Sequence, residues 1–76
     1  MKTVKILLNT INDVKNFVGI VSKYEFDVDL ISGRYAIDAK SIMGIFSLDL
    51  AKDIQADLYT DQPEEILAVI QPYLVP

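Results

Sequence analysis

The residue types in this chain restrict the chemistry that it can perform. The chain contains neither histidine nor cysteine. Histidine is the commonest general base and metal ligand, and cysteine supplies thiolate nucleophiles and metal donors. A nucleophilic site would therefore need a serine activated by lysine, and no sequence signature for such a site is present. Disulfide, thiolate-metal and phosphohistidine chemistry are excluded by the same counts.

Two carboxylates have a spacing that is compatible with catalysis or cation binding. Asp27 and Asp29 alternate with apolar residues, so both should project from the same side of a strand. A pair of this kind can share a proton or bind a cation. A solvated strand face produces the same pattern more often, and we favour that interpretation. The three glycines are too dispersed for a phosphate-binding loop, so no cofactor and no metal are expected.

Ser41 is a candidate for modification because of the residues that follow it. Residues 42–48 are typical of a short helix with Ser41 as its N-cap. A phosphate on this hydroxyl would add about −1.5 to −2 charges at the positive end of that helix. Ile42, Met43 and Phe46 cannot all face inward, so an apolar patch should lie beside the serine. The pattern alone favours an ordinary capping serine.

The elements that position these residues follow from hydrophobic periodicity. Alternation with period two predicts strands over residues 2–8, 26–30, 35–40 and 54–58. Helical spacing predicts helices over residues 13–23, 42–48 and from about 61 to 71. Turn and cap residues separate them: Thr10 or Asn12 before the first helix, Gly33 between two strands, Asp61 as the last cap, and Pro72 as the helix end.

The predicted order is β-α-β-β-α-β-α in a single domain spanning residues 1–76. Four strands with one mainly apolar face must bury that face against helices, which predicts a two-layer α+β fold. The hairpin around Gly33 favours a mostly antiparallel sheet.

Composition and charge limit the partners of the chain. Apolar residues make up 51% of the sequence and charged residues 24%, which is typical of a globular domain. The net charge is −4 and the six lysines and Arg34 are scattered, so neither nucleic acid nor an anionic membrane is an expected partner. No apolar stretch approaches the ~20 residues of a membrane span. We therefore expect a cytoplasmic protein.

Residues 40–48 resemble the regulatory-serine segment of HPr, the phosphocarrier of the bacterial phosphoenolpyruvate:sugar phosphotransferase system (PTS). The preceding Ser22-Lys23-Tyr24 lies at the family's spacing from it, and the element order also agrees, so the resemblance covers nearly the full chain. It implies an open-faced β-sandwich, in which a four-stranded antiparallel sheet carries three helices on one face.

The resemblance also implies roles for individual residues. Ser41 would be the position phosphorylated by the bifunctional HPr kinase/phosphorylase. The neighbouring surface would dock Enzyme I, Enzyme IIA domains, the kinase and a catabolite-control transcription factor. The residues that match this partner-docking patch are Lys40, Ile42, Met43, Gly44 and Phe46.

The chain departs from the family at the phosphohistidine site. HPr proteins carry Gly-x-His-Ala-Arg-Pro at the start of the first helix, and the aligned segment here is shorter. Counting back from Ser22 places Thr10 at the histidine position and Asn12 at the arginine position. Threonine cannot form a phosphoramidate, and Asp13 would repel a phosphate. The degenerate site consists of Thr10, Ile11, Asn12 and Asp13.

These features favour a non-catalytic, HPr-like regulatory interaction module with a phosphoserine switch at Ser41. A constitutive protein-interaction or self-association module is the alternative, with the apolar patch as its docking surface and Ser41 as a cap only. A ferredoxin-like small-molecule sensor shares the β-α-β-β-α-β order, but the short central helix and the extra C-terminal helix argue against it. An enzyme is the class with the least support.

Overall fold

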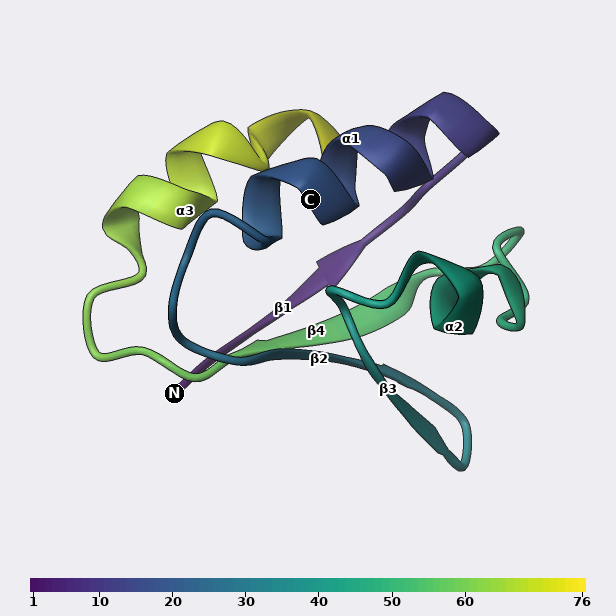
Figure 1. Cartoon of the computed structure of the whole chain (residues 1–76), viewed down its shortest axis with the longest axis horizontal. Coiled ribbons are helices and arrows are strands. Elements are labelled where there is room, and N and C mark those ends of the chain that lie inside the picture. The colour runs from purple at the N-terminus through teal and green to yellow at the C-terminus, as the bar shows by residue number, and fades with distance from the viewer.

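The computed structural model describes all 76 residues as one antiparallel sheet covered by helices. The strands lie in the order β1-β4-β2-β3, and the helices lie over one face of the sheet (Figure 1). This arrangement confirms the predicted α+β open-faced fold. No helix has the length and hydrophobicity needed to cross a bilayer. The elements are β1 (Lys2–Ile6), α1 (Ile11–Val21), β2 (Val28–Ser32), β3 (Tyr35–Asp38), α2 (Ile42–Phe46), β4 (Ile54–Leu58), α3 (Glu64–Val69) and a 3-10 turn (Gln71–Tyr73).

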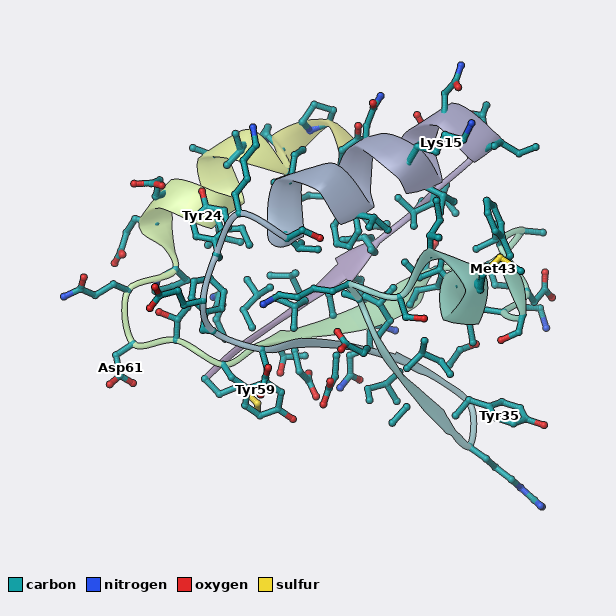
Figure 2. The ribbon with its side chains drawn as sticks, viewed as in Figure 1. Lys15, Tyr24, Tyr35, Met43, Tyr59 and Asp61 are labelled. Carbon is teal, nitrogen blue, oxygen red and sulfur yellow. The ribbon has the colours of Figure 1, made fainter.

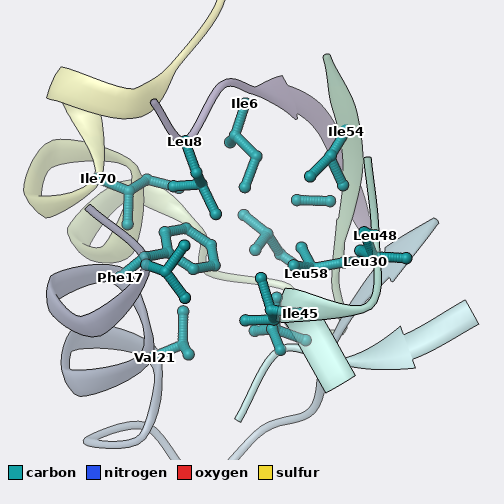
Figure 3. Packing of buried hydrophobic residues seen from close by; sticks show 14 of the residues in the cluster. Ile6, Leu8, Phe17, Val21, Leu30, Ile45, Leu48, Ile54, Leu58 and Ile70 are labelled. Carbon is teal, nitrogen blue, oxygen red and sulfur yellow. The ribbon is translucent and has the colours of Figure 1, made fainter. Parts of the chain in front are cut away.

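The core lies between the sheet and the helices. Alternation along the central strand β4 directs Ile54, Ala56 and Leu58 inward, and all three are fully buried. Phe17 of α1 fills the space above them, and its ring meets that of Tyr73 edge-on with centroids 6.0 Å apart. Figure 3 shows Phe17 packed in the same cluster as Ile54 and Leu58. Fifteen buried apolar residues form this cluster, so the domain has a single core.

The boundaries predicted for the first helix and the second strand differ from those in the structure. Helix α1 begins at Ile11 rather than residue 13, because Thr10 provides the cap. It ends at Val21, two residues before the predicted end. Strand β2 begins at Val28, which is opposite Leu58 in β4, rather than at Phe26. Phe26 instead packs on the ring of Tyr24 in the connection, with centroids 5.3 Å apart.

Strand β3 ends earlier than predicted because the chain turns at Asp38. The Asp38 carbonyl accepts a hydrogen bond from the Ser41 N–H at 3.0 Å, and its carboxylate accepts one from the Lys40 N–H at 2.9 Å. These two bonds form a turn that leads directly into α2. At the other end of the hairpin, Gly33 adopts a φ of +60°, which glycine tolerates without strain.

The prediction of Asp61 as the cap of the third helix was wrong. Helix α3 begins at Glu64, and Pro63 occupies the cap position without a side-chain hydrogen bond. The Thr60 hydroxyl accepts a hydrogen bond from the Gln62 N–H at 3.1 Å, so residues 60–62 form a local turn instead. The predicted end near Pro72 is confirmed, since the α-helix stops at Val69 and a 3-10 turn follows.

The two edges of the sheet differ. Strand β1 leaves the sheet at Ile6, and the Leu7 N–H donates to the Tyr73 carbonyl at 2.9 Å. The C-terminal residues then run antiparallel to β1: Leu74 bridges to Ile6, and the Val75 N–H donates to the Lys5 carbonyl at 2.9 Å. The β1 edge is therefore covered, whereas β3 has no strand on its outer side.

Candidate functional site

Ser41 stands between β3 and α2 with its hydroxyl exposed to solvent. Its backbone is extended, with φ −101° and ψ 99°, and its carbonyl accepts the first helical hydrogen bond, from the Ile45 N–H at 3.1 Å. The hydroxyl oxygen accepts from the Gly44 N–H at 3.3 Å, which is a long capping bond. The serine is therefore held in place by its backbone, while its hydroxyl remains accessible to a modifying enzyme.

An apolar surface follows Ser41 along α2. Met43 is 75% exposed and Phe46 is 39% exposed, whereas Ile42 is half-buried against the core. Ile45, on the opposite side of the helix, is fully buried and anchors α2 (Figure 3). Figure 2 shows the Met43 side chain extending outward from α2. Exposed apolar side chains that are grouped on one element are typical of a docking surface.

Gly44 brings α2 close to the edge strand. A Cβ built at Gly44 would lie 2.6 Å from Cγ2 of Ile37 in β3 and 3.2 Å from the Ser41 hydroxyl oxygen. Real Cβ atoms essentially never approach other atoms as closely as the first of these distances. A larger residue at this position would therefore force α2 or the Ile37 side chain to shift.

Lys40 connects the segment that carries Ser41 to the connection between α1 and β2. Its ammonium donates to the backbone carbonyl of Tyr24 at 2.8 Å, and the side chain is half-buried. The Tyr24 hydroxyl in turn donates to the Glu65 carboxylate at 3.0 Å. Partial burial, together with the hydrogen bond to Glu65 and its charge, raises the pKa of Tyr24 above its ordinary value of 10.0.

Two N–H groups at the N-terminus of α1 are bonded by side chains of the same segment. The Thr10 hydroxyl accepts from the Asp13 N–H at 3.1 Å, and the Asp13 carboxylate accepts from the Asn9 N–H at 3.0 Å. This reciprocal pair resembles a capping box and satisfies N–H groups that an anion would otherwise bind. Asp13 also places a negative charge in the first helical turn. Ile11 is 62% exposed, and Asn12 is exposed beside it.

The two carboxylates predicted for one strand face do not belong to the same strand in the structure. Asp27 lies before β2, and its backbone carbonyl accepts from the Tyr59 N–H at 3.0 Å. Asp29 lies within β2 on the uncovered face, opposite Asp38 on one side and Asp57 on the other. Partial burial, followed by the negative charges of Asp29, Asp57 and Asp27, raises the pKa of Tyr59 above its ordinary value of 10.0. No group of three or more acidic residues is placed to hold a metal ion.

Two further features lie outside the predicted site. A hollow of about 410 Å³ separates the β2–β3 turn from residues 47–52, and Ser41 does not line it.

Asp57 is only 8% exposed, and its carboxylate accepts from Thr3 at 2.9 Å and from Gln55 at 3.0 Å. The sequence carries no signal for the contact with Thr3, because the two residues are 54 positions apart.

Comparisons with known proteins agree with this geometry. The family model described as the PTS HPr component phosphorylation site matches residues 13–71, which include Ser41. HPr-C-His from Thermoanaerobacter tengcongensis is 26% identical, with a TM-score of 0.77 over 93% of this chain and 89% of that chain. The phosphocarrier protein HPr from Bacillus anthracis shares the fold, with 22% identity and a TM-score of 0.72 over 97% of this chain and 96% of that chain. The chain belongs to the HPr family of the phosphotransferase system.

Proposed function

We propose that this HPr-family protein is a regulatory interaction module. It does not relay phosphate through histidine, and phosphorylation of Ser41 changes the surface that its partners contact. The observation that carries this proposal is the contrast between the two ends of the predicted site. At the N-terminus of α1, Thr10 and Asp13 bond two N–H groups, whereas the Ser41 hydroxyl is exposed beside Met43 and Phe46.

The α1 N-terminus supports the first half of the proposal. A phosphohistidine needs an imidazole nitrogen, and the chain contains no histidine. Thr10 and Asp13 already occupy the N–H groups of Asp13 and Asn9. A phosphoryl group brought to this helix end would also meet the Asp13 carboxylate, which opposes its negative charge.

The surroundings of Ser41 support the second half. A phosphate there adds about −1.5 to −2 charges and three acceptor oxygens. Asp38 already places a carboxylate in the turn before Ser41, and the Lys40 ammonium is bonded to the Tyr24 carbonyl. The added charge exceeds the single positive charge of Lys40, so negative charge would remain at the edge of the Met43–Phe46 surface. It would weaken partners that bind by apolar contact alone and strengthen partners that present a cation.

The family suggests candidates for these partners. They are HPr kinase/phosphorylase for the modification, and proteins that resemble Enzyme I or a transcription regulator for docking. All of them are proteins, so the proposed site needs no cofactor. Within this proposal the chain is a substrate and a ligand rather than a catalyst.

Two phosphorylation reactions test the proposal. In the first, the purified protein is incubated with HPr kinase/phosphorylase and ATP, and the phosphosite is mapped by mass spectrometry. We expect phosphate on Ser41, none in Ser41→Ala, and unchanged labelling in Ser47→Ala, whose serine is exposed at the other end of α2. In the second, Enzyme I and phosphoenolpyruvate should leave the protein unlabelled while labelling a histidine-containing HPr. Absence of phosphate on Ser41 would refute the switch, and labelling by Enzyme I would refute the loss of relay.

A second candidate function is constitutive docking through the same surface. The exposure of Met43 together with Phe46 on one short helix favours it, because grouped apolar side chains are typical of a docking surface. In this case Ser41 only caps α2. A pull-down with Met43→Asp, with Val69→Asp on α3 as the matched control, would show loss of a partner in both functions. Only the regulatory function predicts that phosphorylation of Ser41 alters that partner's affinity.

A further inference from the structure

The outer edge of β3 is an unpaired strand edge. The β1 edge is covered by Leu74 and Val75, whereas no strand pairs with the outer side of β3, where only the Asp38 carbonyl is bonded, to the Ser41 N–H. Figure 1 shows β3 as the outermost strand of the sheet. Proteins commonly protect such edges with short strands, charged side chains, proline, a bulge or a covering loop. Strand β3 has only four residues, with exposed charges at Arg34 beside it and Asp38 within it, so its protection depends on length and charge alone. The β2–β3 segment contains no proline, and its pairing register is continuous without a bulge.

The direction of the backbone groups defines what this edge offers. The Ala39 N–H donates to the Val28 carbonyl of β2 at 2.8 Å. The backbone N–H and C=O groups of the odd-numbered residues in and next to β3 therefore point toward β2. N–H and C=O groups of neighbouring residues in a strand point in opposite directions. Ala36 and Asp38 therefore direct their N–H groups away from the sheet, and both residues are exposed.

We propose that this edge pairs with the same edge of a second copy of the chain. The two β3 strands would run antiparallel about a two-fold axis, and the two sheets would join into one. In antiparallel pairing, residues whose backbone N–H and C=O groups point outward must lie opposite each other. Two registers meet this condition, with either Ala36 or Ile37 opposite its own copy on the axis. We take the register with Ala36 on the axis, because it also brings Arg34 of the β2–β3 turn opposite Asp38 of the second copy.

The side chains are complementary in that register. Arg34, the only arginine, stands opposite Asp38 of the second copy, and both are exposed. The two-fold axis generates this pair of opposite charges twice. Tyr35, which is 68% exposed and extends from the hairpin in Figure 2, stands opposite the half-buried Ile37. An aromatic residue opposite a β-branched one is a favourable cross-strand pair.

This surface adjoins the turn that carries Ser41, because Asp38 belongs to both, but the inference does not depend on the proposed function. The strand contributes only four residues, so the interface is short and the dimer should be weak. A weak symmetric dimer is expected to form only at high protein concentration, as mass action requires.

Charge reversal tests the register. Sedimentation equilibrium over a concentration series should show a monomer–dimer equilibrium for the natural chain. Arg34→Asp and Asp38→Arg should each raise the dissociation constant by about tenfold or more, because two pairs change from attraction to repulsion. An equimolar mixture of the two variants should dimerise again, since opposite charges then face each other across the axis. Lys15→Asp, an exposed charge reversal on α1, should have no effect.

Amide hydrogen exchange provides a second readout that does not need a variant. Exchange at the Ala36 and Asp38 N–H groups should slow as protein concentration rises, while exchange at the exposed Lys15 should not. A protein that stays monomeric at every concentration up to its solubility would overturn the proposal. A dimer that survives Arg34→Asp but is lost in Met43→Asp would also overturn it, because such a dimer uses the surface of α2.

Discussion

Replacing Gly44 by alanine tests how closely α2 must approach β3. The new methyl group would lie 2.6 Å from Cγ2 of Ile37 and 3.2 Å from the Ser41 hydroxyl oxygen. Ile37 belongs to the strand and is half-buried, so its branched side chain has little freedom to move aside. The helix must therefore shift outward or the isoleucine must leave its rotamer.

Two opposing terms determine the size of the effect. Alanine in place of glycine ordinarily stabilises a helix interior by about 0.8–1.0 kcal/mol. Forcing a methyl group into a packed contact costs about 1–3 kcal/mol, and we take about 2 kcal/mol for this approach. The net loss in the free energy of unfolding is then about 1 kcal/mol, which lowers the Tm of a domain of this size by about 4–8 °C.

Gly19 provides the matched control for this substitution. It lies within α1, and a Cβ built there would meet no atom within 4 Å. Gly19→Ala should therefore stabilise the protein by about 0.5–1 kcal/mol. Urea titrations of both variants, with extrapolation to water, should thus differ by about 2 kcal/mol when the two estimates are combined.

A double-mutant cycle identifies the clash itself. In an Ile37→Ala background the Cγ2 atom is absent, so Gly44→Ala should become neutral or stabilising. If Gly44→Ala is as stabilising as Gly19→Ala in the natural background, the close approach of α2 to β3 is refuted. If Gly44→Ala destabilises the protein by the same amount in the Ile37→Ala background, contact with Ile37 is not the cause of the destabilisation.

Three hydrogen bonds predict further effects. Thr10→Ala removes the α1 cap and should reduce the free energy of unfolding by about 1 kcal/mol in urea, and an unchanged midpoint would contradict this role. Lys40→Met should cost roughly 1 kcal/mol by the same assay and accelerate amide exchange after α1, because the Tyr24 carbonyl loses its partner. Burial and Glu65 raise the Tyr24 pKa, so the folded state holds this proton more tightly, and the resulting stability is lost as the pH rises through the folded pKa. Tyr24→Phe should therefore lessen the fall in stability between about pH 9 and pH 12, and equal falls would refute this linkage.

Local sequence patterns predicted the candidate site in part. The N-cap at Ser41 is predictable because the hydroxyl, the extended backbone and the first helical turn involve only residues 41–45. The α1 boundary was misplaced because Thr10 and Asn12 are both good caps, and only the bond from the Asp13 N–H decides between them. The prediction of Asp61 as a helix cap was wrong for a similar reason, because the Thr60 hydroxyl accepts from the Gln62 N–H and forms a competing turn.

By itself, the sequence determined the order of the elements, the single apolar face of the sheet, and the absence of histidine beside a retained serine segment. Each of these depends on residue type or on periodicity along the chain. Three features are visible only in the tertiary structure. Gly44 lies close to Ile37, and the Lys40 ammonium donates to the Tyr24 carbonyl. The β1 edge is covered, whereas no strand covers the β3 edge. These contacts depend on how the elements pack against one another, and that packing leaves no periodic signal in the sequence.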